Sequence, residues 1–111
     1  IETMVFDEID TGVSGIAAQR VGEKMSDLSR GKQVLCITHL PQIAAIADNH
    51  DLIEKTERNG RTYTEVRELD RKGRALELAR MHGGDNISEL TLASAEEQLL
   101  AADKYRLTRN N

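Results

Sequence analysis

Two short apolar runs, residues 4–6 and 34–37, constrain the fold of this chain more than any other feature. Between them, apolar residues recur at helical spacing, and Gly31 then marks the end of the predicted helix. Strand, helix and strand in this order predict a right-handed crossover that joins two parallel strands. Uninterrupted apolar runs are typical of strands buried on both faces, so we expect further strands beside this pair. The chain is therefore expected to form an incomplete domain.

The helix between the strands is predicted over residues 14–29, with Ser14 as its N-cap. Four residues at helical spacing define one apolar face, which is expected to lie against the sheet: Ala17, Val21, Met25 and Leu28.

After the second strand, Pro41 predicts the first turn of a short helix over residues 41–47. The pair Asn59-Gly60, between stretches rich in β-branched residues, predicts a β-hairpin. Two further helices are expected over residues 71–81 and 87–105, separated by two glycines. The sequence thus predicts an α/β chain with parallel strands, a hairpin and C-terminal helices, and we treat residues 1–111 as one unit.

The composition is that of a folded globular chain, with 39% hydrophobic and 31% charged residues. The net charge of −4 gives no overall attraction to nucleic acid. No apolar run approaches the roughly 18 residues of a membrane span, so we expect no membrane partner and a cytoplasmic location.

Several side chains are expected to have only structural roles. Cys36 lies inside an apolar run and is expected in the core. The residues of a small basic cluster, Arg71, Lys72 and Arg74, are expected to lie on a solvated face, and Arg74 and Arg80 to face solvent or form ion pairs. His50 and His82 lack metal-ligand spacing and are expected to be structural or exposed.

Polar residues follow both parallel strands, where the working surface of an open α/β sheet lies. Asp7 and Glu8 follow the first strand, and Thr38 and His39 follow the second. Adjacent residues of an extended chain point to opposite sides, so the two carboxylates are expected to have different roles. One would hold a hydrated metal ion while the other would activate a water.

An apolar strand that ends in Asp-Glu is the Walker B pattern of nucleotide hydrolases. The letters DEID also fit the Asp-Glu-x-Asp box of helicases. Such helicases are expected to carry a Ser-Ala-Thr type motif on the next strand, where this chain has Ile37-Thr38-His39. A histidine 31 positions after Glu8 (39 − 8) instead matches the switch histidine of ABC-type ATPases.

With both motifs in place, nearly the whole chain resembles the C-terminal part of the ATPase head of the RecN family, bacterial DNA-repair proteins related to SMC proteins. The segments that carry the resemblance are FDEIDTGVSG, ITHLPQIAAIADNH, the hairpin after His50, and ALELARMHGG. The resemblance implies the C-terminal portion of a P-loop NTPase of the ABC type. It also implies ATP and Mg²⁺ as the ligands of the intact protein.

The resemblance assigns Asp7 to Mg²⁺ through water, Glu8 to the catalytic base, and His39 to the γ-phosphate. It further implies a D-loop that crosses to a partner head, formed by Thr11, Gly12, Val13 and Ser14. In transporters and SMC proteins this loop usually ends in Leu-Asp. This chain has Val13-Ser14 at that place. Asp10 and Gln42 lie close to these motifs in sequence and have no assigned role.

The Walker A pattern and the Leu-Ser-Gly-Gly type signature are both absent from the printed residues. We therefore expect the chain alone not to hydrolyse ATP. The implied partners are the N-terminal half of the same head, a second head in an ATP-dependent dimer, and DNA bound by the full-length protein. The implied role is DNA double-strand-break repair and recombination in the bacterial cytoplasm, associated with the nucleoid.

Two alternatives remain open from the residues. The chain could be the motor half of a helicase, although residues 37–39 disfavour this. It could also be a non-catalytic interaction module whose hairpin offers Tyr63, Val66 and Leu69 to a partner.

Overall fold

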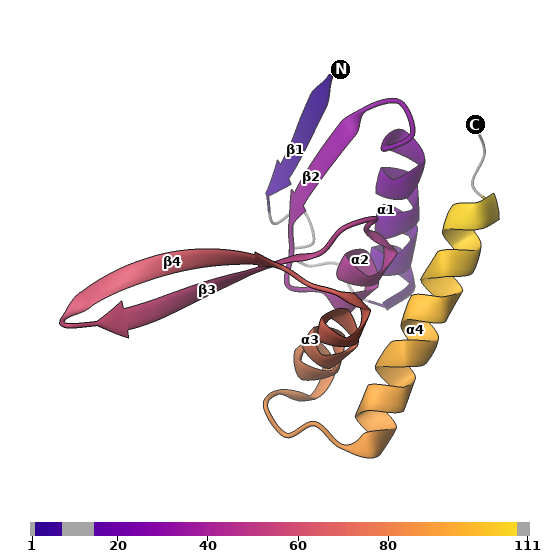
Figure 1. The fold of residues 1–111 in the computed structure, drawn as a ribbon. Coiled ribbons are helices and arrows are strands. Elements are labelled where there is room, and N and C mark those ends of the chain that lie inside the picture. The colour runs from indigo at the N-terminus through magenta and orange to yellow at the C-terminus, as the bar shows by residue number, and fades with distance from the viewer. Residues whose placement is uncertain (1, 8–14, 109–111) are drawn as a thin grey trace.

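The computed structural model describes residues 2–7 and 15–108 (Figure 1). Within these ranges the chain forms a mixed α/β arrangement with one parallel and one antiparallel pair of strands. The elements in chain order are β1 (Thr3–Asp7), α1 (Gly15–Leu28), β2 (Gln33–Ile37), α2 (Pro41–Ile46), β3 (Asp51–Arg58), β4 (Arg61–Glu68), α3 (Arg71–Gly83) and α4 (Glu89–Thr108).

Strands β1 and β2 pair in parallel, as the sequence predicts. Residues that are paired across the two strands lie on the same face of the sheet, and one face is half-buried. The opposite face is open: Val5 is 64% exposed, Leu35 49% and Ile37 50%. The expected burial on both faces is therefore wrong for this structure, because the described residues supply no element to cover the outer face. The helices all lie to one side of this pair in Figure 1.

Helix α1 packs closely on α2. A Cβ atom at Gly22 would lie 3.1 Å from Cγ2 of Ile46, so the missing side chain permits this close approach. The buried residues of α1 are Ala18, Gly22, Met25 and Ser26. The predicted face is thus correct for Met25 but wrong for Ala17, which is exposed. The close approach of Gly22 to α2 thus gives α1 a buried face that combines three small residues with Met25.

The hairpin of β3 and β4 extends away from the helices (Figure 1). Its turn is formed by Asn59 with φ 52° and Gly60 with φ 77°, as expected for the tight turn that the Asn-Gly pair predicts. Every residue of β4 is exposed. Two cross-strand ion pairs lie on the hairpin, Arg58 to Glu65 at 3.0 Å and Arg67 to Glu54 at 3.3 Å.

The main hydrophobic core lies between α2, α3 and α4, not beneath the sheet. Its buried members are Ala44, Ala45, Ile46, Ala75, Leu78, Ala79, Ala95, Leu99 and Ala102. Asp70 caps α3 by accepting a hydrogen bond from the Gly73 amide at 2.7 Å. Among the described residues, none of the helices combines the length and the apolar character needed to span a membrane.

Candidate active site

The carboxyl ends of β1 and β2 lie side by side. Asp7, the last residue of β1, pairs with Ile37, the last residue of β2. Neighbouring strands are separated by about 4.8 Å, so the exposed Asp7 lies next to the strand end that leads to Thr38 and His39. The structure thus brings together the two strand ends that the sequence singled out.

The remaining predicted site residues on the first loop lie outside the described residues. They are the predicted base Glu8, the unassigned Asp10, and the four residues of the predicted D-loop, Thr11, Gly12, Val13 and Ser14. Their roles remain predictions from the sequence.

His39 lies exposed in the connection between β2 and α2. Thr38 Oγ1 accepts a hydrogen bond from the Leu40 amide at 3.0 Å, which closes a local turn around His39. The Leu40 carbonyl in turn accepts from the amides of Ile43 and Ala44, both at 3.2 Å. The backbone at His39 is therefore tied to β2 on one side and to the first turn of α2 on the other.

An exposed carboxylate at this edge suits the chemistry of Mg²⁺. This ion keeps several of its waters and commonly binds through one or two carboxylates together with substrate phosphates. Asp7 could be the one protein carboxylate that such a Mg²⁺ site needs. Within residues 2–7 and 15–108, no group of three or more His, Cys, Asp or Glu side chains could hold a metal ion.

Gln42 follows this turn on α2. Its Oε1 atom is buried and has no hydrogen-bond partner within the part of the chain that the structure describes. The sequence placed Gln42 near the site without a role, and the structure gives it a half-buried position on the helix that follows His39.

Arg74 corrects the sequence prediction. It was expected to face solvent or to form an ion pair, but it is only 8% exposed. Its guanidinium donates to main-chain carbonyls of Ala44, Ala45, Ala47 and Asp48 at 2.9 to 3.5 Å. The one sequence signal is its position four residues before the buried Leu78, which places it on the core face of α3.

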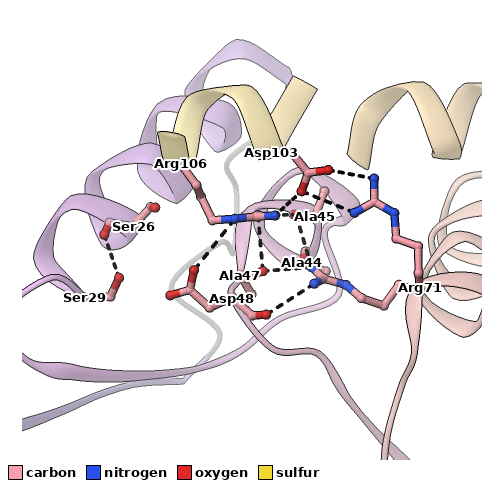
Figure 2. A network of polar contacts seen from close by, with 10 residues as sticks. Ser26, Ser29, Ala44, Ala45, Ala47, Asp48, Arg71, Asp103 and Arg106 are labelled. Atoms are coloured by element: carbon pink, nitrogen blue, oxygen red, sulfur yellow. Dashed lines mark hydrogen bonds and ion pairs between the residues drawn. The ribbon is translucent and has the colours of Figure 1, made fainter. Parts of the chain in front are cut away.

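Arg106 of α4 approaches two of these four carbonyls (Figure 2). It donates to Ala45 at 3.3 Å and Ala47 at 3.4 Å, and it pairs with Asp48 and Asp103. Burial lowers the pKa of Arg74 from its ordinary value, and the positive charge of Arg106 lowers it further. An arginine nevertheless keeps its charge in proteins, so both residues remain cationic donors.

The other basic residues behave largely as predicted. Arg71 and Lys72 are exposed, and Arg71 pairs with Asp103 at 2.8 Å. Arg80 forms an ion pair with Glu77 at 2.5 Å, and the hydrogen bonds that Arg80 donates to this carboxylate raise the pKa of Arg80.

His50, at the start of the hairpin, is half-buried, and its Nδ1 atom has no hydrogen-bond partner among the described residues. Burial lowers its pKa below the ordinary value of 6.5, and Arg74 lowers it further, against smaller opposing effects of Glu77 and Asp51. Below that ordinary value the unfolded chain therefore binds more protons than the folded chain. Folding stability should fall as the pH falls from above 6.5 toward the lower folded pKa.

We expect the His50→Gln variant to lose less stability than the unsubstituted chain between about pH 7.5 and about pH 5.5. Urea denaturation followed by circular dichroism measures this difference. His82→Gln is the matched control, since His82 is exposed and bonds Gln98 at 2.9 Å. Equal pH dependence in the His50→Gln variant and the unsubstituted chain would exclude this role of His50.

Comparison with known proteins adds to this geometry. No profile of a known protein family matches the chain. The chain is 46% identical over 108 residues to the DNA repair protein RecN of Bacillus subtilis, covering 97% of the chain and 19% of that protein. It is 50% identical over 99 residues to RecN of Halalkalibacterium halodurans, covering 89% of the chain and 18% of that protein. For RecN of Vibrio cholerae the identity is 44% over 100 residues, or 90% of the chain and 18% of that protein.

The chain therefore spans about a fifth of the length of the curated relatives it matches. Three relatives from different bacteria align with 89 to 97% of the chain at 44 to 50% identity. Over these residues the chain belongs to the RecN family.

Proposed function

We propose that this chain is the C-terminal part of a RecN ATPase head and carries its hydrolytic groups. The observation that carries the proposal is the pairing of Asp7 with Ile37, which sets the acidic strand end beside the strand end that leads to His39. The names of the relatives support a role in DNA repair. They favour neither a helicase half nor a non-catalytic module.

In the proposed mechanism, each polar residue at this edge has one task. Asp7 would hold Mg²⁺ through water, and the ion would supply charge neutralisation of the transferred phosphate. Glu8 takes the proton of the attacking water as general base. His39, which is exposed after β2, contacts and so senses the γ-phosphate of ATP. The reaction is ATP hydrolysis, with ATP and Mg²⁺ as the ligands of the full-length protein.

The proposed partners follow from what these residues lack. None of them holds the β- and γ-phosphates, a task that the N-terminal half of the same head would perform. The open apolar face of Val5, Leu35 and Ile37 supports a partner of this kind, because parallel sheets are normally covered on both faces. The proposed D-loop, residues 11–14, would contact a second head across an ATP-dependent dimer.

In the intact protein, two heads would close on ATP and separate after hydrolysis. This cycle would couple nucleotide state to DNA binding during the repair and recombination of broken DNA. The proposed location is the bacterial cytoplasm, in association with the nucleoid. The chain alone would not hydrolyse ATP.

The Asp7→Asn variant of a full-length RecN protein that contains this chain tests the proposed metal role. The Mg²⁺ concentration that gives half-maximal turnover should rise about 10- to 100-fold, the usual effect of losing an outer-sphere partner of a metal. Steady-state ATPase assays across a Mg²⁺ titration measure this shift. Asp85→Asn serves as the control, because Asp85 lies exposed in the turn after α3. An unchanged Mg²⁺ requirement in Asp7→Asn would remove Asp7 from the site.

A further inference from the structure

Helix α2 cannot satisfy the carbonyl groups at its own C-terminal end. It has only six residues, and isolated helices this short are unstable in water. The last carbonyls of any helix lack partners within that helix, and an unpaired buried carbonyl is costly. Five of its six residues are buried: Pro41, Ile43, Ala44, Ala45 and Ile46. Partners from other elements must therefore satisfy its final carbonyls.

Arg74 of α3 and Arg106 of α4 supply those partners. Nη2 of Arg74 lies 3.2 Å from the carbonyl oxygens of Ala44 and Ala45, and 2.9 Å from that of Ala47. Nη1 of Arg106 reaches the Ala45 and Ala47 carbonyls at 3.3 and 3.4 Å (Figure 2). Two positive charges thus lie where the dipole of α2 places its partial negative charge.

The opposite end of α2 leads directly to His39. The turn of Thr38 and Leu40 ties the backbone around His39 to the first turn of the helix. On a third side, the close approach of Gly22 fixes α2 against α1. A displacement of α2 would therefore move the segment that carries His39.

We propose that Arg74, assisted by Arg106, is a positioning residue that sets the place of His39 through α2. This inference rests on the proposed function, in which His39 contacts the γ-phosphate of ATP. Arg74 itself is buried among carbonyls of α2 and the residues just after it, and touches no reacting atom in this proposal. Its loss should therefore lower kcat while the KM for ATP changes little.

A double-mutant cycle on a full-length RecN protein that contains this chain tests the inference. Arg74→Met should lower the kcat of ATP hydrolysis about 10- to 100-fold, the scale of a misplaced active-site group. In the His39→Ala background the same substitution should change kcat by less than about 2-fold, because the group it positions is gone. Lys72→Met is the matched control on the same helix, and it should leave kcat unchanged because Lys72 is exposed.

The possible outcomes separate the two proposals. If Arg74→Met lowers kcat equally with and without His39, Arg74 acts by another route and only the positioning inference is overturned. The same holds if Arg74→Met raises the KM for ATP and leaves kcat unchanged. If His39→Ala alone leaves kcat unchanged, the proposed role of His39 fails and the inference fails with it.

A milder variant keeps the test decisive if Arg74→Met does not fold. Arg106→Met removes only the two longer bonds to Ala45 and Ala47, together with its ion pairs. It should lower kcat by a smaller factor, again without further effect in the His39→Ala background. Arg74→Lys, which keeps a charged donor, should recover part of the kcat that Arg74→Met loses. Full additivity of Arg106→Met with His39→Ala would overturn the inference.

Discussion

Replacing Glu8 with Gln in a full-length RecN protein that contains this chain is expected to lower the kcat of ATP hydrolysis by about 10²- to 10⁴-fold. The amide keeps the size of the carboxylate but cannot accept the proton of the attacking water. ATP should still bind, because in the proposed mechanism Glu8 acts on a phosphate that other residues hold. Proposed head dimers should therefore persist in ATP, which light scattering after size-exclusion chromatography measures.

The control for this substitution is Glu2→Gln, which makes the same chemical change just before β1. Glu2 is exposed and its ion pair to Lys32, at 3.8 Å, is long, so turnover should match that of the unsubstituted protein. Turnover near the unsubstituted rate in Glu8→Gln would exclude Glu8 as the base. Loss of ATP binding in the same variant would assign Glu8 to nucleotide binding instead.

Local signals in the sequence predicted most of the elements correctly. The apolar runs and the helical spacing between them predicted the parallel pair of β1 and β2. The Asn59-Gly60 pair predicted the hairpin, because few other residues accept the positive φ values of its turn. The helix predicted over residues 71–81 spans Arg71–Gly83 in the structure, and the helix predicted over residues 87–105 spans Glu89–Thr108.

Features that depend on contacts between distant elements were not predicted. The buried position of Arg74 depends on carbonyls of α2 and of the two residues after it, which lie 26 to 30 residues away in sequence. The buried face of α1 depends on the close approach of Gly22 to Ile46. Residue type predicts an exposed arginine, and helical spacing predicts a buried face on α1 that includes Ala17. Both rules fail where a short buried helix needs donors and close neighbours.

The same distinction applies to the candidate site. The strand ends that bear Asp7 and precede His39 were predictable, because parallel strands end at the same edge of a sheet. The anchoring of α2 behind His39 was not predictable, since the relevant donors come from α3 and α4.

The core between α2, α3 and α4 should depend strongly on Leu99. This residue is 0% exposed and, with Leu78, is one of the two largest fully buried side chains among the described residues. Most buried members of its cluster are alanines, whose single methyl groups cannot move to fill a gap. Leu99→Ala should therefore lower the free energy of unfolding by about 2 to 5 kcal/mol, in the upper part of that range. Urea denaturation of the chain measures this change.

Leu100→Ala is the matched control, because it makes the same substitution at the next residue of α4. Leu100 is 57% exposed, so its truncation removes little buried surface and leaves no enclosed cavity. Its cost should stay below about 1 kcal/mol, partly because alanine favours the helix. A similar cost for both variants would mean that α4 does not pack against α2 and α3 as described. A large cost at Leu99 alone would support the packing that holds α2, and with it the geometry behind His39.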